Sequence, residues 1–263
     1  MAVTFVTISC QGVIAYYFIR PVNNIIYLYF SGDVEKLMPI VNLPKFKRLP
    51  NHIGIIPDGN RRWAADKGMT KDRGYKYGIA PGLELYHLLL ALSVKELTFY
   101  GFTQDNTKRP AEQKHAFRDA CVDAVRRLAK LDASLRVVGD TSSPSFPPEL
   151  LPYTKRTVFG KGLMKINFLV NYGWQWDLRH GFSEPGAKTA KNKDIISSIA
   201  SSDVSRIDLI IRWGGRRRLS GFLPVQTIYS DFYIVDDYWP DFEPDHLFEA
   251  LRWYEGQDIT LGG

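Results

Sequence analysis

The stretch that decides the fold is HIGIIPDGNRRWA, residues 52–64. It runs from an isoleucine-rich segment into Pro-Asp-Gly-Asn and then into two arginines and a tryptophan. Similar apolar runs recur along the chain, separated by segments of helical character: ELTFYGF (96–102), LRVVG (135–139), INFLVNYG (166–173) and DLIIRW (208–213). Continuous apolar strands that alternate with helices indicate a parallel sheet covered on both faces. The sequence therefore predicts the α/β class.

Length and composition describe an ordinary folded protein. The chain has 263 residues, of which 45% are hydrophobic and 24% charged, so one main core is expected and neither disorder nor a polytopic membrane protein is indicated. The net charge of +6 is compatible with an anionic partner. Cys10 and Cys121 are too few for a disulfide framework and form no zinc motif. A reducing, cytoplasmic location fits this cysteine usage best.

Residues 1–19 raise the question of a membrane segment because they carry no charge. Threonines, Ser9, Gln11 and Gly12 dilute their apolar content, whereas a spanning helix needs about 20 predominantly apolar residues. No basic region precedes the apolar stretch, which argues against a secretory signal. Three interpretations stay open: an extension outside the main domain, with Met38 as an alternative start, a surface β segment, or a membrane anchor.

The Pro-Asp-Gly-Asn junction has the features of an anion site. In open α/β sheets, ligands bind beyond the carboxyl ends of the strands. Gly59 allows a tight turn, and a helix that starts near Asn60 would aim free amides at an anion. Arg62 adds a guanidinium group, while Asp58 would repel an anion unless a divalent cation lay between them, as carboxylates and phosphates share Mg²⁺. The alternative is that Asp58 only caps the helix.

Two further junctions carry cations or amides at strand ends. DLIIRWGGRRRLSGF (208–222) contains a Gly-Gly turn and four arginines within seven residues, and the run after TFYGF contains Thr103, Asn106, Lys108 and Arg109. Three such strand ends predict a phosphate site, although surface charge remains an alternative for the arginines at 216–218. GxxxxGK[ST], GxGxxG, RNP and zinc-finger motifs are absent, so neither ordinary nucleotide binding nor a nucleic-acid partner is supported.

Four segments together resemble the successive conserved regions of the cis-prenyltransferases, the undecaprenyl diphosphate synthase family: HIGIIPDGNRRWA, YGFTQDNTKRP, NYGWQWD and RWGGRRRLSGFLPVQTIYSDFYIVDDYWPDF. The resemblance covers residues 52–263 in the same order. It implies a homodimer of single-domain subunits, each with a central parallel six-stranded sheet, flanking helices and an apolar substrate tunnel. It also implies condensation of prenyl diphosphate substrates in the presence of Mg²⁺. We therefore expect an amino-terminal extension at 1–46 and a catalytic domain at 47–263.

The resemblance also assigns roles to individual residues. Asp58 is expected to handle Mg²⁺ and the departing diphosphate, and Asn106 to lie beside the reacting allylic carbon. The expected ligands of the allylic diphosphate are Gly59, Asn60, Arg61, Arg62, Lys71, Tyr75 and Arg109. The expected ligands of the second diphosphate are Arg212, Arg218 and Ser220, and the expected metal ligands are Asp58 and Asp231.

The tunnel would need apolar helices beside these anion sites. Residues 110–131 place Phe117, Cys121, Val125 and Leu128 on one helical face. GLELYHLLLAL (82–92) is a second candidate. Both helices could line the tunnel, and both could equally be plain core.

The sequence departs from the family pattern mainly at the second substrate site. Arg216 and Arg217 replace an acid and an imidazole, Asp231 replaces a glutamate, and Thr260 stands where the family has an Arg-x-Gly motif that helps to bind isopentenyl diphosphate. Elsewhere Tyr75 replaces a histidine, Thr107 a tryptophan and Gln113 a glutamate, while Lys71 replaces an arginine. Changed charge at this site suggests a changed second substrate or altered metal dependence.

Pro57 and Pro224 fit a branch of the family that joins two allylic diphosphates head to middle into lavandulyl-type products. We therefore expect an enzyme that couples an allylic diphosphate with a second prenyl diphosphate, head to middle as well as head to tail, with a short or medium product. Regular cis elongation with isopentenyl diphosphate alone is the main alternative. A non-catalytic partner subunit is the other, although such subunits typically lose the aspartate found here as Asp58. A lipid product would also allow peripheral membrane association.

Overall fold

The computed structural model describes the backbone of residues 4–10, 13–20, 25–29, 38–39, 43–183 and 196–258. The chain divides into two compact units, Met1–Lys47 and Arg48–Gly263. The first unit is an antiparallel four-stranded sheet with the strands in chain order. Its strands are β1 (Thr4–Cys10), β2 (Val13–Arg20), β3 (Ile25–Tyr29) and β4 (Met38–Pro39).

The second unit is built on a seven-stranded sheet with the order β11-β10-β5-β6-β9-β7-β8. Its strands are β5 (His52–Ile56), β6 (Glu96–Tyr100), β7 (Ala133–Val138), β8 (Thr157–Val158), β9 (Met164–Leu169), β10 (Leu209–Arg212) and β11 (Asp231–Ile234). All neighbouring pairs are parallel except β7 and β8. The expected parallel sheet of six strands is thus extended by one short antiparallel edge strand.

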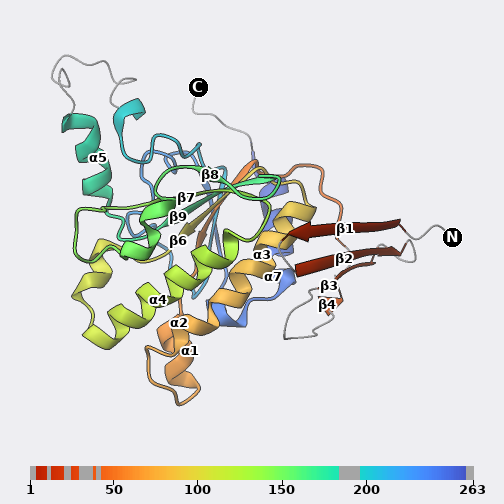
Figure 1. The fold of residues 1–263 in the computed structure, drawn as a ribbon, viewed down its shortest axis with the longest axis horizontal. Helices are drawn as coiled ribbons and strands as arrows, with labels where there is room; N and C mark the ends of the chain where they lie inside the picture. The colour runs from red at the N-terminus through yellow and green to blue at the C-terminus, as the bar shows by residue number, and fades with distance from the viewer. Residues whose placement is uncertain are drawn as a thin grey trace. The chain divides into compact units, whose positions relative to one another are not determined.

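Helices flank this sheet, with α3 and α4 packed side by side across one face (Figure 1). The α-helices are α1 (Asn60–Asp66), α2 (Gly74–Tyr77), α3 (Ile79–Ala91), α4 (Ala111–Leu128), α5 (Trp174–Ser183) and α7 (Pro244–Glu255). Short 3-10 turns are η1 (Gln104–Lys108), η2 (Pro148–Tyr153) and η3 (Trp239–Asp241). In the described part of the chain, no helix combines the length and apolar content needed to cross a bilayer.

Burial on both faces explains why the central strands are continuously apolar. Every residue of β5, β6 and β10 is buried, as expected for parallel strands covered on two sides. On the face away from α3 and α4, strand residues such as Ile56 and Ile210 pack against Val204, Phe222 and Leu223. The residues on either side of β10, Val204 before it and Phe222 and Leu223 after it, therefore help to cover the second face.

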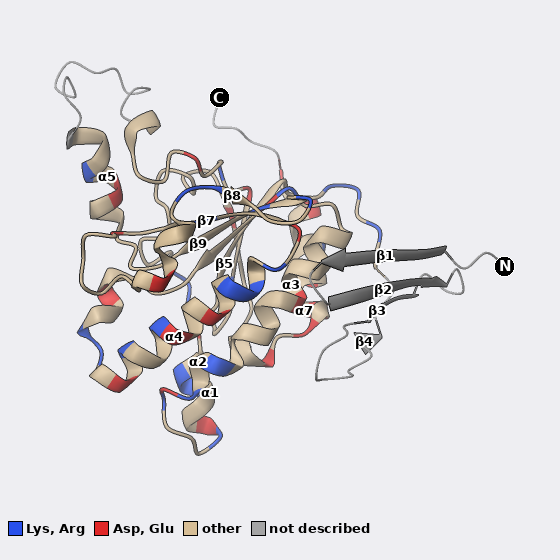
Figure 2. Ribbon diagram, viewed as in Figure 1, with Lys and Arg blue, Asp and Glu red and all other residues tan. Residues whose placement is uncertain are grey.

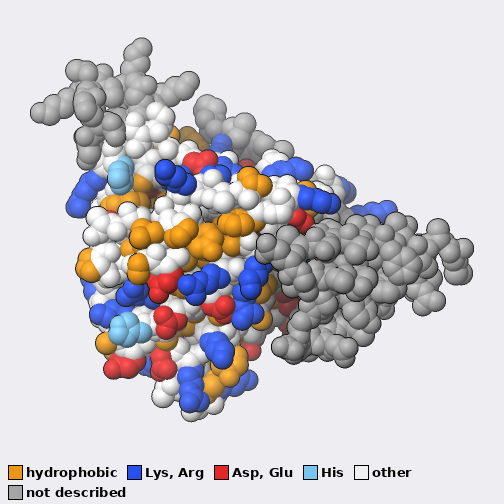
Figure 3. Space-filling model, viewed as in Figure 1, with side chains coloured by type: hydrophobic (Ala, Val, Ile, Leu, Met, Phe, Trp, Pro, Cys, Tyr) orange, Lys and Arg blue, Asp and Glu red, His pale blue; other side chains and the backbone are white. Residues whose placement is uncertain are grey.

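Apolar and charged side chains occupy adjacent areas of the face that carries α3 and α4. Basic residues occur along α1, α2 and α4 (Figure 2). Apolar side chains gather near the middle of the same face, with charged side chains beside them (Figure 3). The combination places cationic and apolar surface next to each other near the helices that follow β5 and β6.

Candidate active site

Asp58 lies just beyond the carboxyl end of β5, separated from it only by Pro57. The chain turns at Gly59, whose φ of 103° lies in the left-handed region that glycine tolerates. A Cβ at Gly59 would come within 2.6 Å of the Tyr238 ring. Asp58 Oδ1 accepts a hydrogen bond from the Gly59 amide at 2.6 Å. The N-cap of α1 is Gly59, and no side chain caps it, so Asp58 is not the helix cap that one interpretation assigned.

Arg212 brings the neighbouring strand end to Asp58. It is the last residue of β10 and pairs in register with Ile56 of β5, so both strands end at the same edge. Its guanidinium Nη2 donates to Asp58 Oδ2 at 2.7 Å, and its side chain is only 4% exposed. Arg62 Nη2 lies 3.6 Å from Asp58 Oδ1 and donates to the Gly214 carbonyl at 2.8 Å. The Asp58 carboxylate therefore lies between two guanidinium groups.

These contacts determine the charge of Asp58. Burial alone would raise the pKa of its carboxyl group, but the hydrogen bond and charge of Arg212, the Gly59 amide and the charge of Arg62 together lower the pKa below its ordinary value. The carboxylate is consequently ionised at neutral pH.

The loop after β10 returns to Arg212. The Nη1 atom of Arg212 donates to the Arg218 carbonyl and to Ser220 Oγ, the latter at 3.1 Å. Tyr100 donates to the Ser220 carbonyl at 2.7 Å, and Ser220 has a φ of 54°. The three residues predicted for the second diphosphate thus come together beside Asp58. The side chains at 216–218 are exposed, and no ion pair among the described residues includes them.

Another group of predicted residues gathers around Tyr75 in α2. Arg109 donates to the Tyr75 hydroxyl at 2.7 Å, and Tyr75 stacks on Phe117 with ring centroids 4.4 Å apart. Arg61 donates to Gln113 Oε1 at 3.2 Å. Asn60 is 9% exposed, donates to the Pro57 carbonyl, and leaves its buried Oδ1 without a hydrogen-bond partner.

Two other predicted residues have different surroundings. Asn106 lies in η1, where its Oδ1 accepts a hydrogen bond from the Thr103 amide at 3.0 Å. Lys71 is exposed in the turn between α1 and α2, and no ion pair in the described part of the chain involves it. The structure therefore places Lys71 at the surface, whereas Asn106 helps to shape a turn beside Arg109.

An apolar pocket opens beside this group. Asn60, Tyr75 and Pro57 contribute to its lining, together with Phe117 and Trp239. The remaining lining residues come mainly from α3, α4 and the strands β6 and β9, and glycines and alanines are common among them. They are Gly78, Ile79, Gly82, Leu83, Phe99, Gly101, Ala120, Cys121, Ala124, Leu128 and Phe168. The two predicted helices do border apolar space, while an elongated tunnel stays a prediction.

Asp231 does not join this site within one chain. It is the first residue of β11 and pairs with Leu209 at the amino end of β10, whereas Arg212 and Asp58 lie at the carboxyl edge. Three residues of strand separate the two positions by roughly 10 Å. The pKa of the Asp231 carboxyl group is raised above its ordinary value, mainly by burial and also by the charge of Asp208, while the charge of Arg48 offsets part of the rise. Within one subunit Asp58 and Asp231 therefore lie at opposite edges of the sheet, because residue order along the strands separates them, and a metal-binding role for Asp231 stays a prediction.

Known proteins with similar sequences identify the family. The model of the family described as undecaprenyl diphosphate synthase matches residues 56–262. The chain belongs to this family. The isoprenyl transferase of Chlamydia pneumoniae is 34% identical over 238 residues, which cover 84% of this chain and 95% of that relative. The farnesyl-diphosphate-specific ditrans,polycis-undecaprenyl-diphosphate synthase of Vibrio vulnificus (strain YJ016) is 30% identical over 229 residues, which cover 81% of this chain and 91% of that enzyme.

A solved structure shares the fold of this cis-prenyltransferase. Lavandulyl diphosphate synthase from Lavandula x intermedia, in complex with dimethylallyl diphosphate, matches with a TM-score of 0.71 and 24% sequence identity. The match covers 81% of this chain and 98% of the solved one. Together with the family match, it confirms the predicted α/β architecture and the assignment as a prenyl-transferring enzyme of isoprenoid biosynthesis.

The residues of this cis-prenyltransferase fit a metal held mainly by its substrate. In the described part of the chain, no cluster of three or more His, Cys, Asp or Glu side chains could hold a metal ion. Asp58 is a single ionised carboxylate whose side chain is 33% exposed. Mg²⁺ is commonly bound by one or two carboxylates together with substrate phosphates and water. In such an arrangement Asp58 would be a protein ligand.

Sequence reasoning missed three aromatic residues that shape the site. The Tyr238 ring lies 5.0 Å from the Arg62 guanidinium carbon, and the Trp239 amide donates to the Asp58 carbonyl at 3.0 Å. Tyr100 holds Ser220, as described above. The segments DDYWPDF and TFYGF contain these three residues, and their place in family-like segments was a signal of a role at the site. The local sequence does not indicate that they contact Asp58 or Ser220.

Proposed function

We propose that this cis-prenyltransferase couples an allylic diphosphate, namely dimethylallyl, geranyl or farnesyl diphosphate, with a second prenyl diphosphate and releases diphosphate. The observation that carries the proposal is the placement of Asp58 between Arg212 and Arg62, directly beside the apolar pocket that Pro57 and Asn60 help to line. An anion site adjoining an apolar pocket matches a ligand that has a diphosphate head and a hydrocarbon tail.

The pocket would hold the prenyl tail. Burial of each CH₂ group contributes about 0.8 kcal/mol, so a tail of several isoprene carbons would dock firmly between α3 and α4. Small residues such as Gly82 and Ala124 leave room for it. A docked tail would fix where the diphosphate lies, which would bring the breaking carbon–oxygen bond near the arginines beside the pocket.

The charged residues would stabilise the departing group. The carbon–oxygen bond of the allylic diphosphate breaks with its electron pair on oxygen, the double bond of the acceptor forms the new carbon–carbon bond, and the acceptor loses a proton. Arg61, Arg62 and Arg109 would stabilise the negative charge that develops on the released diphosphate, and Asn106 would lie beside the allylic carbon. Mg²⁺, when bound at Asp58, would neutralise part of the same charge.

The second substrate site supports a broader acceptor range. Arg212, Arg218 and Ser220 would bind the second diphosphate, and Arg216 with Arg217 would add two cations at the same loop. Pro57 and Pro224 are features of the head-to-middle branch, and the lavandulyl diphosphate synthase shares the fold. The proposed products are therefore short or medium isoprenoids formed head to middle as well as head to tail.

Two alternative functions have specific support. A regular cis-polyprenyl diphosphate synthase that accepts only isopentenyl diphosphate is favoured by the relatives named undecaprenyl-diphosphate synthases. A non-catalytic partner subunit is disfavoured, because Asp58 is retained and ion-paired with Arg212. Homodimer formation and peripheral association with a membrane, on the cytoplasmic side, complete the proposal.

The deciding experiment combines purified protein and MgCl₂ with dimethylallyl, geranyl or farnesyl diphosphate, each with and without isopentenyl diphosphate, and identifies the products by mass spectrometry after dephosphorylation. Branched products without isopentenyl diphosphate are expected. Products that form only with isopentenyl diphosphate would support the regular synthase, and no product in any mixture would support the partner subunit.

Asp58→Asn provides the matched test of the site. It should lower kcat by roughly a hundredfold or more, because an amide neither carries charge nor binds Mg²⁺ well. Asp119→Asn, at an exposed position of α4, should leave kcat unchanged. Wild-type turnover by Asp58→Asn would refute the assigned role.

A further inference from the structure

Two arginines next to pocket-lining residues are held by neutral side chains instead of carboxylates. Arg109 Nη1 donates to the hydroxyl group of Tyr75 at 2.7 Å, and Arg61 Nη1 donates to the amide oxygen of Gln113 at 3.2 Å. The ion pairs formed among the described residues include neither arginine. Both guanidinium groups are therefore oriented without forming an ion pair within the part of the chain that the structure describes.

The aromatic rings fix the orientation of Arg109. Tyr75 is 4% exposed and stacks on Phe117 with an interplanar angle of 4°. The Arg109 guanidinium carbon lies 5.4 Å from the centroid of Phe117, within the range of a cation–π interaction. Tyr75 accepts the hydrogen bond from Arg109, so its own hydroxyl hydrogen remains to donate to an anion.

The two cations act on each other. Burial lowers the pKa of Arg109 and the nearby charge of Arg61 lowers it further, while Tyr75 and the more distant charge of Asp58 offset only part of this lowering. Two like charges close together are unfavourable, and an anion that contacts both guanidinium groups would relieve their repulsion. A carboxylate at position 75 or 113 would relieve it permanently and would compete with such a ligand.

The location of this pair agrees with an anionic ligand that carries an apolar tail. Tyr75 and Phe117 line the same pocket as Pro57 and Asn60, which flank Asp58. The contacts come from separate elements, since Tyr75 belongs to α2, Arg61 to α1 and Gln113 to the first turn of α4. Packing of the three helices therefore brings Arg61 and Arg109 to their neutral partners.

We propose that Tyr75 and Gln113 are positioning residues that orient Arg109 and Arg61 toward the diphosphate of the allylic substrate without neutralising them. This inference rests on the proposed function and refines it, because it explains how positive charge is kept beside the apolar pocket. The neutral partners favour a highly charged diphosphate over a singly charged ligand, since affinity then depends on two unpaired cations.

The test uses two independent variants of the full chain. Tyr75→Phe keeps the ring stack and removes only the hydroxyl group, and Gln113→Glu places a carboxylate against Arg61. Isothermal titration calorimetry with inorganic diphosphate in MgCl₂ gives the affinity at low and high salt, and initial rates with geranyl diphosphate give KM and kcat. Each variant should weaken diphosphate binding and raise KM by roughly tenfold, with a smaller change in kcat. Gln113→Glu should also reduce the salt dependence of binding.

Matched controls separate positioning from general damage. Tyr77→Phe changes a half-exposed tyrosine of the same helix, and His115→Glu adds a carboxylate to an exposed position of α4 two residues from Gln113. Both controls should keep the wild-type KM and salt dependence. Wild-type turnover together with unchanged diphosphate affinity and KM in Tyr75→Phe and Gln113→Glu would overturn this inference alone. If the wild-type protein neither bound diphosphate nor turned over any prenyl diphosphate, the proposed function and this inference would both be refuted.

Discussion

The most consequential single residue is Asp58, because its carboxylate joins two strand ends. Arg212 binds it from β10 at 2.7 Å, and Arg212 is itself almost fully buried. A buried charge is costly unless it is paired and hydrogen-bonded. Asp58 therefore has two roles: it supplies the carboxylate of the proposed metal site, and it compensates the charge of Arg212.

The ion pair between Asp58 and Arg212 should make stability depend on pH. The pKa of Asp58 is lowered from 3.8 in the folded protein, so its ionised form stabilises the fold above the unfolded pKa, and this contribution is lost as pH falls through the folded pKa. Arg212→Gln should lower the free energy of unfolding by about 1–3 kcal/mol at pH 7. The difference from wild type, measured by urea unfolding, should shrink as the pH is lowered below about 4.

The control for this prediction is an exposed ion pair. Arg127 and Asp123 on α4 have side chains that are 54% and 44% exposed, so Arg127→Gln should change the free energy of unfolding by less than about 0.5 kcal/mol at any pH. A pH-independent difference between wild type and Arg212→Gln would contradict the assigned role of Asp58.

At the scale of elements, the conformation of the loop after β10, residues 213–223, does not follow from the geometry of the strand before it. Positive φ values occur at Gly214, Gly215, Ser220, Gly221 and Leu223, so the chain winds back on itself and returns Ser220 to Arg212. Glycine accepts this conformation without steric cost, whereas other residues are strained there. The Gly-Gly sequence therefore allows the loop to return to Arg212.

Gly214→Ala tests how closely this loop approaches Asp58. A Cβ at Gly214, which has a φ of +83°, would lie 2.6 Å from Arg62 Nη2 and 3.2 Å from the backbone carbon of Asp58. The variant should lose about 2 kcal/mol or more of stability, measured by thermal unfolding, and kcat should fall because Arg62 is displaced. Gly68→Ala is the matched control, since its φ is +69° and nothing lies within 4 Å of the new Cβ. Gly68→Ala should lose only about 1 kcal/mol of stability from backbone strain, with no loss of kcat. Equal losses of stability and kcat in Gly214→Ala and Gly68→Ala would contradict the prediction.

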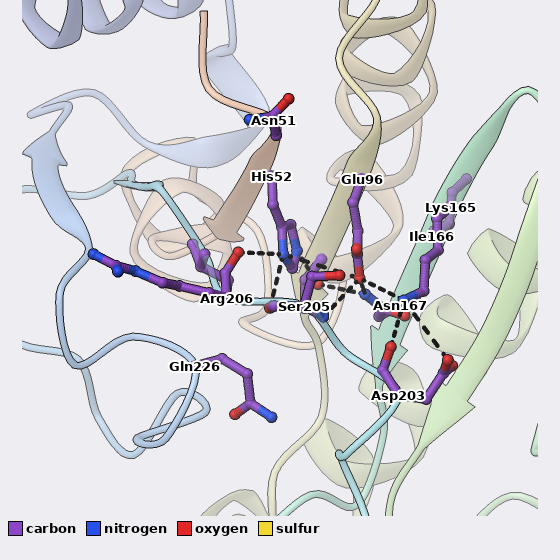
Figure 4. A network of polar contacts seen from close by, with 12 residues as sticks. Asn51, His52, Glu96, Lys165, Ile166, Asn167, Asp203, Ser205, Arg206 and Gln226 are labelled. Carbon is purple, nitrogen blue, oxygen red and sulfur yellow. Dashed lines mark hydrogen bonds and ion pairs between the residues drawn. The ribbon is translucent and has the colours of Figure 1, made fainter. Parts of the chain in front are cut away.

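At the scale of the whole domain, the two edges of the main sheet have different roles. The carboxyl edge carries Asp58 and Arg212, and the amino edge carries a buried polar network (Figure 4). There His52 contacts Thr98 Oγ1 at 2.7 Å, and Asn167 donates to Glu96 at 2.7 Å and to Thr98 at 2.9 Å. Because nearly all these side chains are buried and hydrogen-bonded, the network contributes to stability and to the choice of strand neighbours.

Thr98→Val should separate stability from catalysis. Thr98 is fully buried and contacts both His52 and Asn167, so an isosteric valine leaves buried polar groups unsatisfied and should cost about 2–4 kcal/mol in the free energy of unfolding. The kcat at a temperature where the variant is folded should stay unchanged, because the hydrogen bonds of Thr98 link it to His52 and Asn167 and not to the residues around Asp58. Thr157→Val, in the edge strand β8, is the control and should be nearly neutral. A lowered kcat in folded Thr98→Val would contradict this division of roles.

The local sequence pattern was sufficient to predict the main strands, helix α4 and the proximity of two strand ends. The five quoted apolar runs coincide with β5, β6, β7, β9 and β10, because strands buried on two faces have no polar alternation to obscure them. The helix expected at 110–131 is α4 at Ala111–Leu128. The grouping of Asp58 with Arg212 also followed from sequence, because parallel strands end at a common edge.

What the amino-acid sequence determined by itself was the α/β class, the family and the strand-end cations, since each depends on short segments read in order. Tertiary structure alone decided which side chains meet. Arg109 and Tyr75 are 34 residues apart, Arg61 and Gln113 are 52 apart, and Tyr100 and Ser220 are 120 apart, so helix and sheet packing, which no local pattern encodes, brings them together. It likewise put Asp231 at the far edge of the sheet, because position along a strand, not proximity of motifs in sequence, determines which edge a residue occupies.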